Sequence, residues 1–191
     1  MKIKVGFFSI LLFSSLLLFH SQFAFASFLA IFIHEVGHII LAKLFNIEFS
    51  ECSIGIFGAG LMPRHTHYSY KDEILLAAGG PLINICSAIV VLPFLSVFYN
   101  DFLIYFILSS VALALFNIMP IKDLDGGRIL YSIICIVKNE RIATFLVSLL
   151  SFLTLFLLWV FSVYFLLIAS SNLSLFIFSV SIFFKLFVEK I

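Results

Sequence analysis

The stretch IFIHEVGHII, residues 31–40, places two histidines and one glutamate inside a run that is otherwise apolar apart from one glycine. An apolar run of this kind predicts a helix that is embedded in a membrane. An ionisable side chain at the middle of a membrane costs on the order of 2.5 kcal/mol or more, so it usually marks a function. The stretch therefore predicts a membrane helix that carries a functional site.

The composition of the whole chain agrees with a membrane setting. The 191 residues are 63% hydrophobic and 11% charged, with 26 phenylalanines and a mean hydropathy of +1.25. Soluble domains are only about half apolar. The net charge of +1 gives no indication of nucleic-acid binding. We predict an integral, multi-pass membrane protein with one domain over residues 1–191.

Six segments come near the length of about 20 apolar residues that a helix needs to cross a bilayer. The predicted fold is therefore all-α and polytopic, with spans at about 3–20, 23–45, 74–99, 102–121, 142–169 and 173–189. With the N-terminus inside, all eleven Lys and Arg residues fall at inner ends or inner connections, and the three outer connections contain none. Because short cytoplasmic connections are rich in Lys and Arg, both termini are predicted to be cytosolic.

The first span has an alternative reading. The sequence MKIK, the apolar run to Phe19 and the following FAFAS also resemble a cleavable signal peptide ending at Ala26. Cleavage would leave five spans with the same orientation. The run is long for a signal peptide and a second span follows at once, which favours an uncleaved anchor.

Two regions do not have the pattern of a span. Residues 46–72 contain SIGIFGAGLMP, in which isoleucines alternate with small residues among glycines, the pattern of a short strand or hairpin associated with the membrane. Residues 127–137, GRILYSIICIV, are too short to cross and are predicted to form an interfacial or re-entrant helix.

The chemistry is predicted at His34, Glu35 and His38. Residues four apart on a helix lie on one face, so His34 and His38 can bind one metal ion. Glu35 follows the first histidine and can reach a water held by the metal, as in H-E-x-x-H metalloproteases. A hydrogen-bonded polar cluster is the alternative, but three ionisable residues at ligand spacing are poorly explained by packing. We predict one Zn²⁺ per chain, although imidazole and carboxylate ligands accept other metals.

A catalytic zinc generally takes three protein ligands. The stretch NIMPIKDLDGGRIL, residues 117–130, is the best source of the third. Pro120 is predicted to break the fourth helix, and Gly126 and Gly127 allow a sharp turn. Both Asp123 and Asp125 lie at this turn, and spacing alone does not separate them.

Three motifs then resemble one family. HEVGH at 34–38, AAGGPLIN at 77–84 and FNIMPIKDLDGGRI at 116–129 are similar, in order and spacing, to the site-2 protease family of intramembrane zinc metalloproteases. The short layout looks most like the stage IV sporulation protein FB branch. The resemblance implies a three-helix catalytic core, at about residues 23–137. We expect no PDZ-like domain and no nucleotide-binding CBS domain, and the latter expectation departs from members that carry a C-terminal CBS domain.

The resemblance also implies roles for particular residues. His34, His38 and Asp125 would bind zinc, and Glu35 would be the catalytic acid and base. Asn117 and Pro120 would shape the substrate site. The central helix of the core would contain the conspicuous residues of the second motif, namely Gly79, Gly80, Pro81 and Asn84.

The expected activity is hydrolysis of a peptide bond in a membrane-associated protein, within or near the bilayer on the cytosolic side. The branch implies a sporulation sigma-factor precursor as substrate, a bacterial cell or forespore membrane as location, and regulatory membrane proteins as partners. Residues 50–62 are expected to hold the substrate extended by adding it as a strand. The alternative is a non-enzymatic metal transporter or scaffold, which would need further ligands along a pathway.

Overall fold

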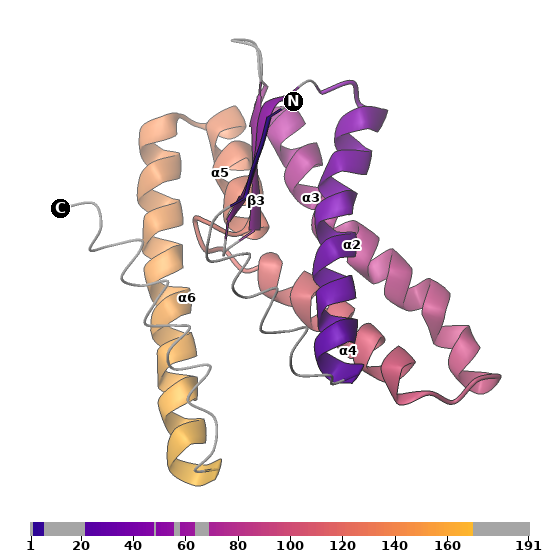
Figure 1. Cartoon of the computed structure of the whole chain (residues 1–191). Coiled ribbons are helices and arrows are strands. Elements are labelled where there is room, and N and C mark those ends of the chain that lie inside the picture. Colours follow the sequence, from indigo (N-terminus) through magenta and orange to yellow (C-terminus); the bar gives the residue numbers. More distant parts are fainter. Residues whose placement is uncertain (1, 6–21, 48, 56–57, 64–68, 170–191) are drawn as a thin grey trace. The chain divides into compact units, whose positions relative to one another are not determined.

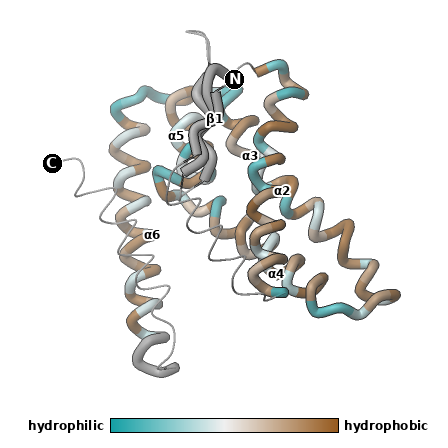
Figure 2. The backbone as a smooth tube through the Cα atoms, in the orientation of Figure 1, coloured by the Kyte–Doolittle hydropathy of each residue, from teal (hydrophilic) through white to brown (hydrophobic). Residues whose placement is uncertain are grey.

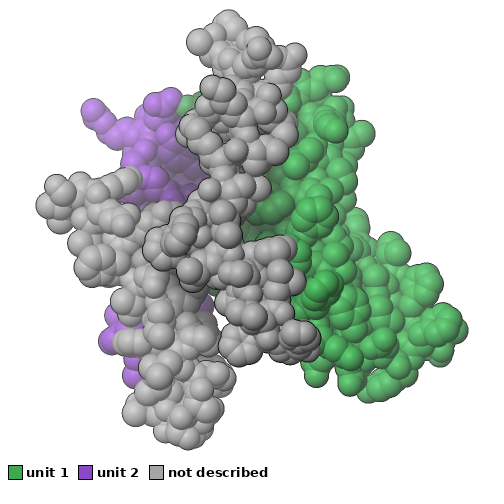
Figure 3. Space-filling view, viewed as in Figure 1, with its two compact units in different colours: residues 1–118 green, residues 119–191 purple. Residues whose placement is uncertain are grey.

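The computed structural model describes residues 2–5, 22–47, 49–55, 58–63 and 69–169. The chain divides into two compact units, residues 1–118 and 119–191 (Figure 3). Each unit is described by itself.

Three helices form the body of the first unit (Figure 1). They are α2 (Gln22–Leu44), α3 (Tyr70–Val91) and α4 (Asp101–Asn117), and a short 3₁₀ helix, η1 (Leu92–Ser96), continues α3. Each of the three packs against the other two. Side chains cap the starts of α3 and α4: the Ser69 hydroxyl accepts from Lys71 N at 3.2 Å, and Asn100 Oδ1 accepts from Phe102 N at 2.9 Å.

Small residues line the buried face of α2. The buried positions recur every three or four residues and are Ala26, Ala30, His34, Gly37, His38 and Ala42. Large apolar side chains such as Phe25, Phe32 and Leu44 are exposed instead. This distribution suits a membrane, where small residues let helices approach closely and large apolar side chains face lipid. Figure 2 shows hydrophobic residues along the described helices.

A three-stranded sheet completes the first unit. Its strands are β1 (Lys2–Val5), β2 (Phe49–Gly55) and β3 (Gly58–Pro63), in the order β1-β2-β3. β2 pairs in parallel with β1, placing Val5 opposite Ile54, and antiparallel with β3, placing Gly55 opposite Gly58. β2 is therefore the central strand, and β1 and β3 are the edges.

The second unit contains two described helices, α5 (Asp125–Val137) and α6 (Glu140–Ala169), which pack against each other. The segment before α5 is fixed by backbone turns, in which Ile121 N donates to Met119 O at 2.8 Å and Leu124 N donates to Ile121 O at 2.9 Å. Ile121 is fully buried, so this segment is part of the packed unit.

Three described helical segments are long and apolar enough to cross a membrane: Gln22–Leu44, Tyr70–Ser96 and Glu140–Tyr164. They correspond to the predicted spans at 23–45, 74–99 and 142–169. Most of the predicted first span and all of the last lie outside the described residues, as does the alternative signal peptide up to residue 21, whereas its predicted end at Ala26 lies within α2. Six spans are therefore not confirmed.

Three predicted boundaries differ from the structure. The helix expected from residue 3 does not begin there, because residues 2–5 form β1. The span expected at 102–121 ends at Asn117, and α4 is 17 residues long. The helix therefore ends before it reaches Pro120, which lies in the turn at 118–120. The helix predicted at 127–137 begins two residues earlier, at Asp125.

Candidate metal centre

His34 and His38 lie one turn apart on the buried face of α2. Their side chains are among the few polar groups buried in the described residues, at 4% and 5% relative exposure. Their rings meet edge to face, with centroids 4.9 Å apart. Glu35 follows His34 and is partly buried. The structure thus brings together the two predicted metal ligands of the first unit, as expected for positions four apart on one helix.

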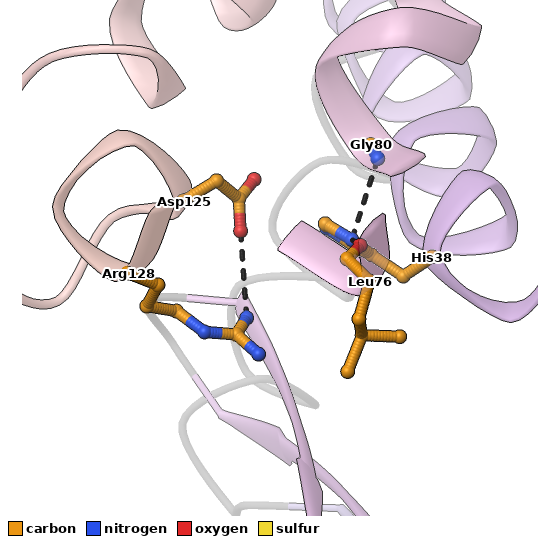
Figure 4. A network of polar contacts seen from close by, with 5 residues as sticks. All are labelled: His38, Leu76, Gly80, Asp125 and Arg128. Carbon is orange, nitrogen blue, oxygen red and sulfur yellow. Dashed lines mark hydrogen bonds and ion pairs between the residues drawn. The ribbon is translucent and has the colours of Figure 1, made fainter. Parts of the chain in front are cut away.

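His38 is held against α3 (Figure 4). Its Nδ1 lies 2.8 Å from the carbonyl oxygen of Leu76 and 3.3 Å from the backbone nitrogen of Gly80. These two contacts require opposite tautomers, because a carbonyl only accepts and an N–H only donates. The shorter contact is the better hydrogen bond, so Nδ1–H donates to Leu76. In this tautomer the unprotonated ring nitrogen of His38 is Nε2, the form that a metal ligand needs.

Because Gly80 has no side chain, the space between its Cα and the two imidazole rings is not filled by a Cβ. A Cβ placed at Gly80 would lie 2.6 Å from His38 Nε2 and closer still to His34 Nε2. The two Nε2 atoms therefore converge on one point beside Gly80. Because zinc binds imidazole nitrogen at about 2.0–2.1 Å, two nitrogens converging on one small space fit a shared metal ion.

The approach of α2 to α3 depends on two further glycines. A Cβ at Gly79 would lie 2.6 Å from the carbonyl oxygen of Gly37, and a Cβ at Gly37 would meet Gly79 in the same way. The backbones of the two helices are therefore in direct contact. This contact brings His34 and His38 within hydrogen-bond reach of α3.

His34 is also tied to α3, through a side chain. Asn84 Nδ2 lies 3.2 Å from His34 Nδ1, and Asn84 is fully buried. Both histidines are thus anchored to α3 through Nδ1. Pro81, between these contacts, has no N–H for the carbonyl of Ala77 and so interrupts the helix hydrogen bonds at this point.

Asp125 belongs to the second unit, where it is the first residue of α5. It is buried, whereas Asp123 is exposed. The Arg128 Nη1 atom lies 3.5 Å from Asp125 Oδ1 (Figure 4). His34, His38 and Asp125 are the buried residues in the described part of the chain that offer strong metal-ligand atoms. Burial distinguishes the two aspartates that spacing left open.

The turn before Asp125 is packed tightly. A Cβ at Gly127 would clash with the carbonyl of Ile121. Ser151 of α6 is buried and accepts from Lys122 N at 2.9 Å, while its hydroxyl donates to Val147 O at 2.6 Å. Sequence reasoning missed Ser151, because a serine in an apolar helix carries no signal of the loop it will meet.

Asn117 and Pro120 lie at the end of α4 and in the segment after it. Asn117 Nδ2 donates to the carbonyl of Leu113 in its own helix at 3.0 Å, and the residue is partly exposed. Pro120 is also partly exposed. The contacts of these two residues do not bear on substrate binding. Their role in shaping the substrate site stays a prediction.

Two curated proteins and one solved structure are similar to this chain. No protein-family model matches the chain. A curated zinc metalloprotease of Methanocaldococcus jannaschii is 29% identical over 113 residues, 56% of this chain and 32% of that protein. Stage IV sporulation protein FB of Bacillus subtilis is 29% identical over 106 residues, 54% of this chain and 37% of that protein. The matched region thus spans about a third of each curated relative's length.

A solved structure has the same fold. It is a site-2 protease from Methanocaldococcus jannaschii, with a TM-score of 0.69 and 21% identity, and the match covers 95% of this chain and 87% of that one. Fold and site together define a class, a polytopic membrane protein with an H-E-x-x-H metal motif on a buried helix face. Within that class, two curated relatives are similar to this chain over about half of its length, and the solved site-2 protease shares its fold.

Proposed function

We propose that this chain is an intramembrane zinc metalloendopeptidase of the site-2 protease type. The observation that carries the proposal is the convergence of His34 Nε2 and His38 Nε2 on one point beside Gly80, on a helix long enough to cross a membrane. The name of the archaeal relative supports zinc as the metal.

His34, His38 and Asp125 are proposed to hold the ion, with Asp125 chosen over Asp123 because it is the buried aspartate and directly precedes glycine. Two imidazoles and one carboxylate leave a coordination position open for water, as catalytic zinc requires. When bound, zinc polarises the scissile carbonyl and lowers the pKa of the water.

Glu35 is proposed to move the proton. Its carboxylate accepts a proton from the attacking water as the water oxygen bonds to the peptide carbonyl carbon. It then gives that proton to the leaving amide nitrogen as the C–N bond breaks. The products are a carboxylic acid end and an amine end, and Glu35 returns to its starting state.

The substrate is proposed to be a membrane-associated protein held as an added strand. An exposed strand edge supplies main-chain hydrogen bonds with little side-chain selectivity, and β3 is an edge strand here. A proline substitution can test this edge, because proline has no N–H to donate to an added strand. Proline at Ile54 would disrupt the central strand β2 and not the edge. Proline in β3 is the better probe, because alternate N–H groups of β3 point away from β2.

The test compares Gly60→Pro with Leu61→Pro, because successive N–H groups of a strand point to opposite sides. The variant whose N–H pointed outward should keep the fold and its metal but lose cleavage. If both variants fold and cleave at the native rate, the added-strand proposal is wrong.

The sidedness and location of the reaction are also part of the proposal. Water is proposed to enter from the cytosol, because the basic residues gather at one side of the predicted spans. The likeness to a sporulation protein of Bacillus subtilis supports a bacterial cell or forespore membrane. The membrane-tethered precursor of a sporulation sigma factor is proposed as the substrate because the resemblance of the motifs implies it. Regulatory membrane proteins would act on the same domain.

A metal transporter or scaffold is not favoured. A transport path would need further ligands, and among the described residues the buried histidine and acidic side chains are confined to His34, His38 and Asp125.

Co-expression with membrane-tethered candidate precursors tests the proposal, with Glu35→Gln as the matched variant. The native chain should cleave a precursor and the variant should not. Equal cleavage by both would refute the protease proposal, and metal uptake into vesicles without any cleavage would favour transport.

A further inference from the structure

We propose that Asn84 is a positioning residue whose amide oxygen accepts a hydrogen bond from His34 Nδ1–H, and so directs the lone pair of His34 Nε2 to the metal. The inference rests on the proposed metal centre. It assigns a function to a buried amide on α3 that does not itself touch the ion or the substrate.

The geometry places the Asn84 amide against the imidazole. Asn84 has 0% relative exposure, and its Nδ2 lies 3.2 Å from His34 Nδ1. Its Oδ1 is buried and has no hydrogen-bond partner among the described residues. The oxygen and nitrogen of a side-chain amide have nearly the same shape and exchange places when the amide is rotated by half a turn.

The two amide orientations have opposite consequences for His34. If Nδ2 donates, Nδ1 must accept, and the neutral imidazole then carries its hydrogen on Nε2, where no metal can bind. If Oδ1 faces the ring, Nδ1–H donates to it and the Nε2 lone pair is free. Because His34 Nε2 faces the same point as His38 Nε2, the second orientation is the one that permits metal binding.

The same arrangement already occurs at His38. There Nδ1 donates to a backbone carbonyl of α3, that of Leu76, at 2.8 Å. The side-chain carbonyl of Asn84 would do for His34 what the backbone carbonyl does for His38. Partners of this kind fix the tautomer and orientation of metal-binding histidines, and removing them costs about 10–100-fold in metal affinity.

The experiment measures zinc affinity of the purified full chain in detergent by competition with a chelator. Asn84→Asp keeps an acceptor but removes the donor, and Asn84→Leu removes both at similar volume. Ser110→Ala is the control, because it truncates another fully buried polar side chain of the same unit. Thermal unfolding of the zinc-free proteins reports folding separately.

Asn84→Leu should lose about 10–100-fold in zinc affinity, while Asn84→Asp and Ser110→Ala should stay near the native value. A folded Asn84→Leu protein with native zinc affinity would overturn the inference. So would a folded Asn84→Asp protein that loses as much zinc affinity as Asn84→Leu. If Asn84→Leu does not fold, Asn84→Asp decides: retained affinity supports the acceptor role, and a tenfold or greater loss overturns it. A native chain that binds no zinc would instead refute the proposed metal centre.

Discussion

A methyl group at Gly80 tests whether the two histidines share an ion. In Gly80→Ala the added Cβ would lie 2.6 Å from His38 Nε2 and closer to His34 Nε2. Ordinary contacts of Cβ atoms begin at about 3.4 Å, so both rings must move away. The methyl group would then occupy space that a metal at about 2.0–2.1 Å from each nitrogen needs.

The expected result is a loss of zinc affinity larger than the roughly 100-fold upper value for removing a supporting hydrogen bond, because two ligands are displaced together. Alanine is favoured over glycine in a helix by about 1 kcal/mol. This preference offsets part of the destabilisation that the clash causes in the zinc-free protein. Zinc per chain after chelator competition is the assay. A folded Gly80→Ala protein with native zinc affinity would refute the shared site.

Three other changes test the second unit. Asp125→Asn should reduce the zinc bound per chain, whereas Asp123→Asn, at an exposed position, should not. Equal amounts of bound zinc in the two variants would show that Asp125 is not the third ligand. Gly127→Ala should destabilise the unit in thermal unfolding, because its Cβ meets the carbonyl of Ile121, and an unchanged Tm would contradict that contact. Ser151→Ala should lower the free energy of unfolding by about 0.5–1.5 kcal/mol, since it removes the hydroxyl that accepts from Lys122 N. An unchanged free energy in denaturant unfolding would contradict a stabilising role for that hydrogen bond.

The sequence predicted the helix that carries the histidines because two independent signals coincide there. An apolar run sets the helix, and the spacing of His34 and His38 sets the face, and both are local properties. The helix at 127–137 was predicted from its apolar run alone, and it begins two residues earlier, at Asp125. The resemblance of three motifs then predicted the site-2 protease family, a prediction that local patterns alone do not provide.

Other features depend on contacts between distant segments. α4 is 17 residues long because the chain turns after Asn117. The prediction, which used apolar composition alone, placed the end of this helix at residue 121. The paired residues of β1 and β2, such as Lys2 and Glu51, are 49 positions apart in the sequence, a separation that no local pattern reveals. Gly80 and Asn84 appeared in a recognised motif, but only the structure shows that one faces the imidazole nitrogens and the other contacts His34.

The central claim is that this chain hydrolyses peptide bonds with a metal and Glu35. The most direct measurement strips the purified native chain and its Glu35→Gln variant of metal, reloads each with one equivalent of zinc, and follows cleavage of a membrane-tethered precursor in lipid vesicles. Both proteins should rebind zinc equally, because Glu35 is not a proposed ligand, and only the native chain should cleave. Cleavage by the native chain without zinc, or equal cleavage by the zinc-loaded variant, would contradict the claim.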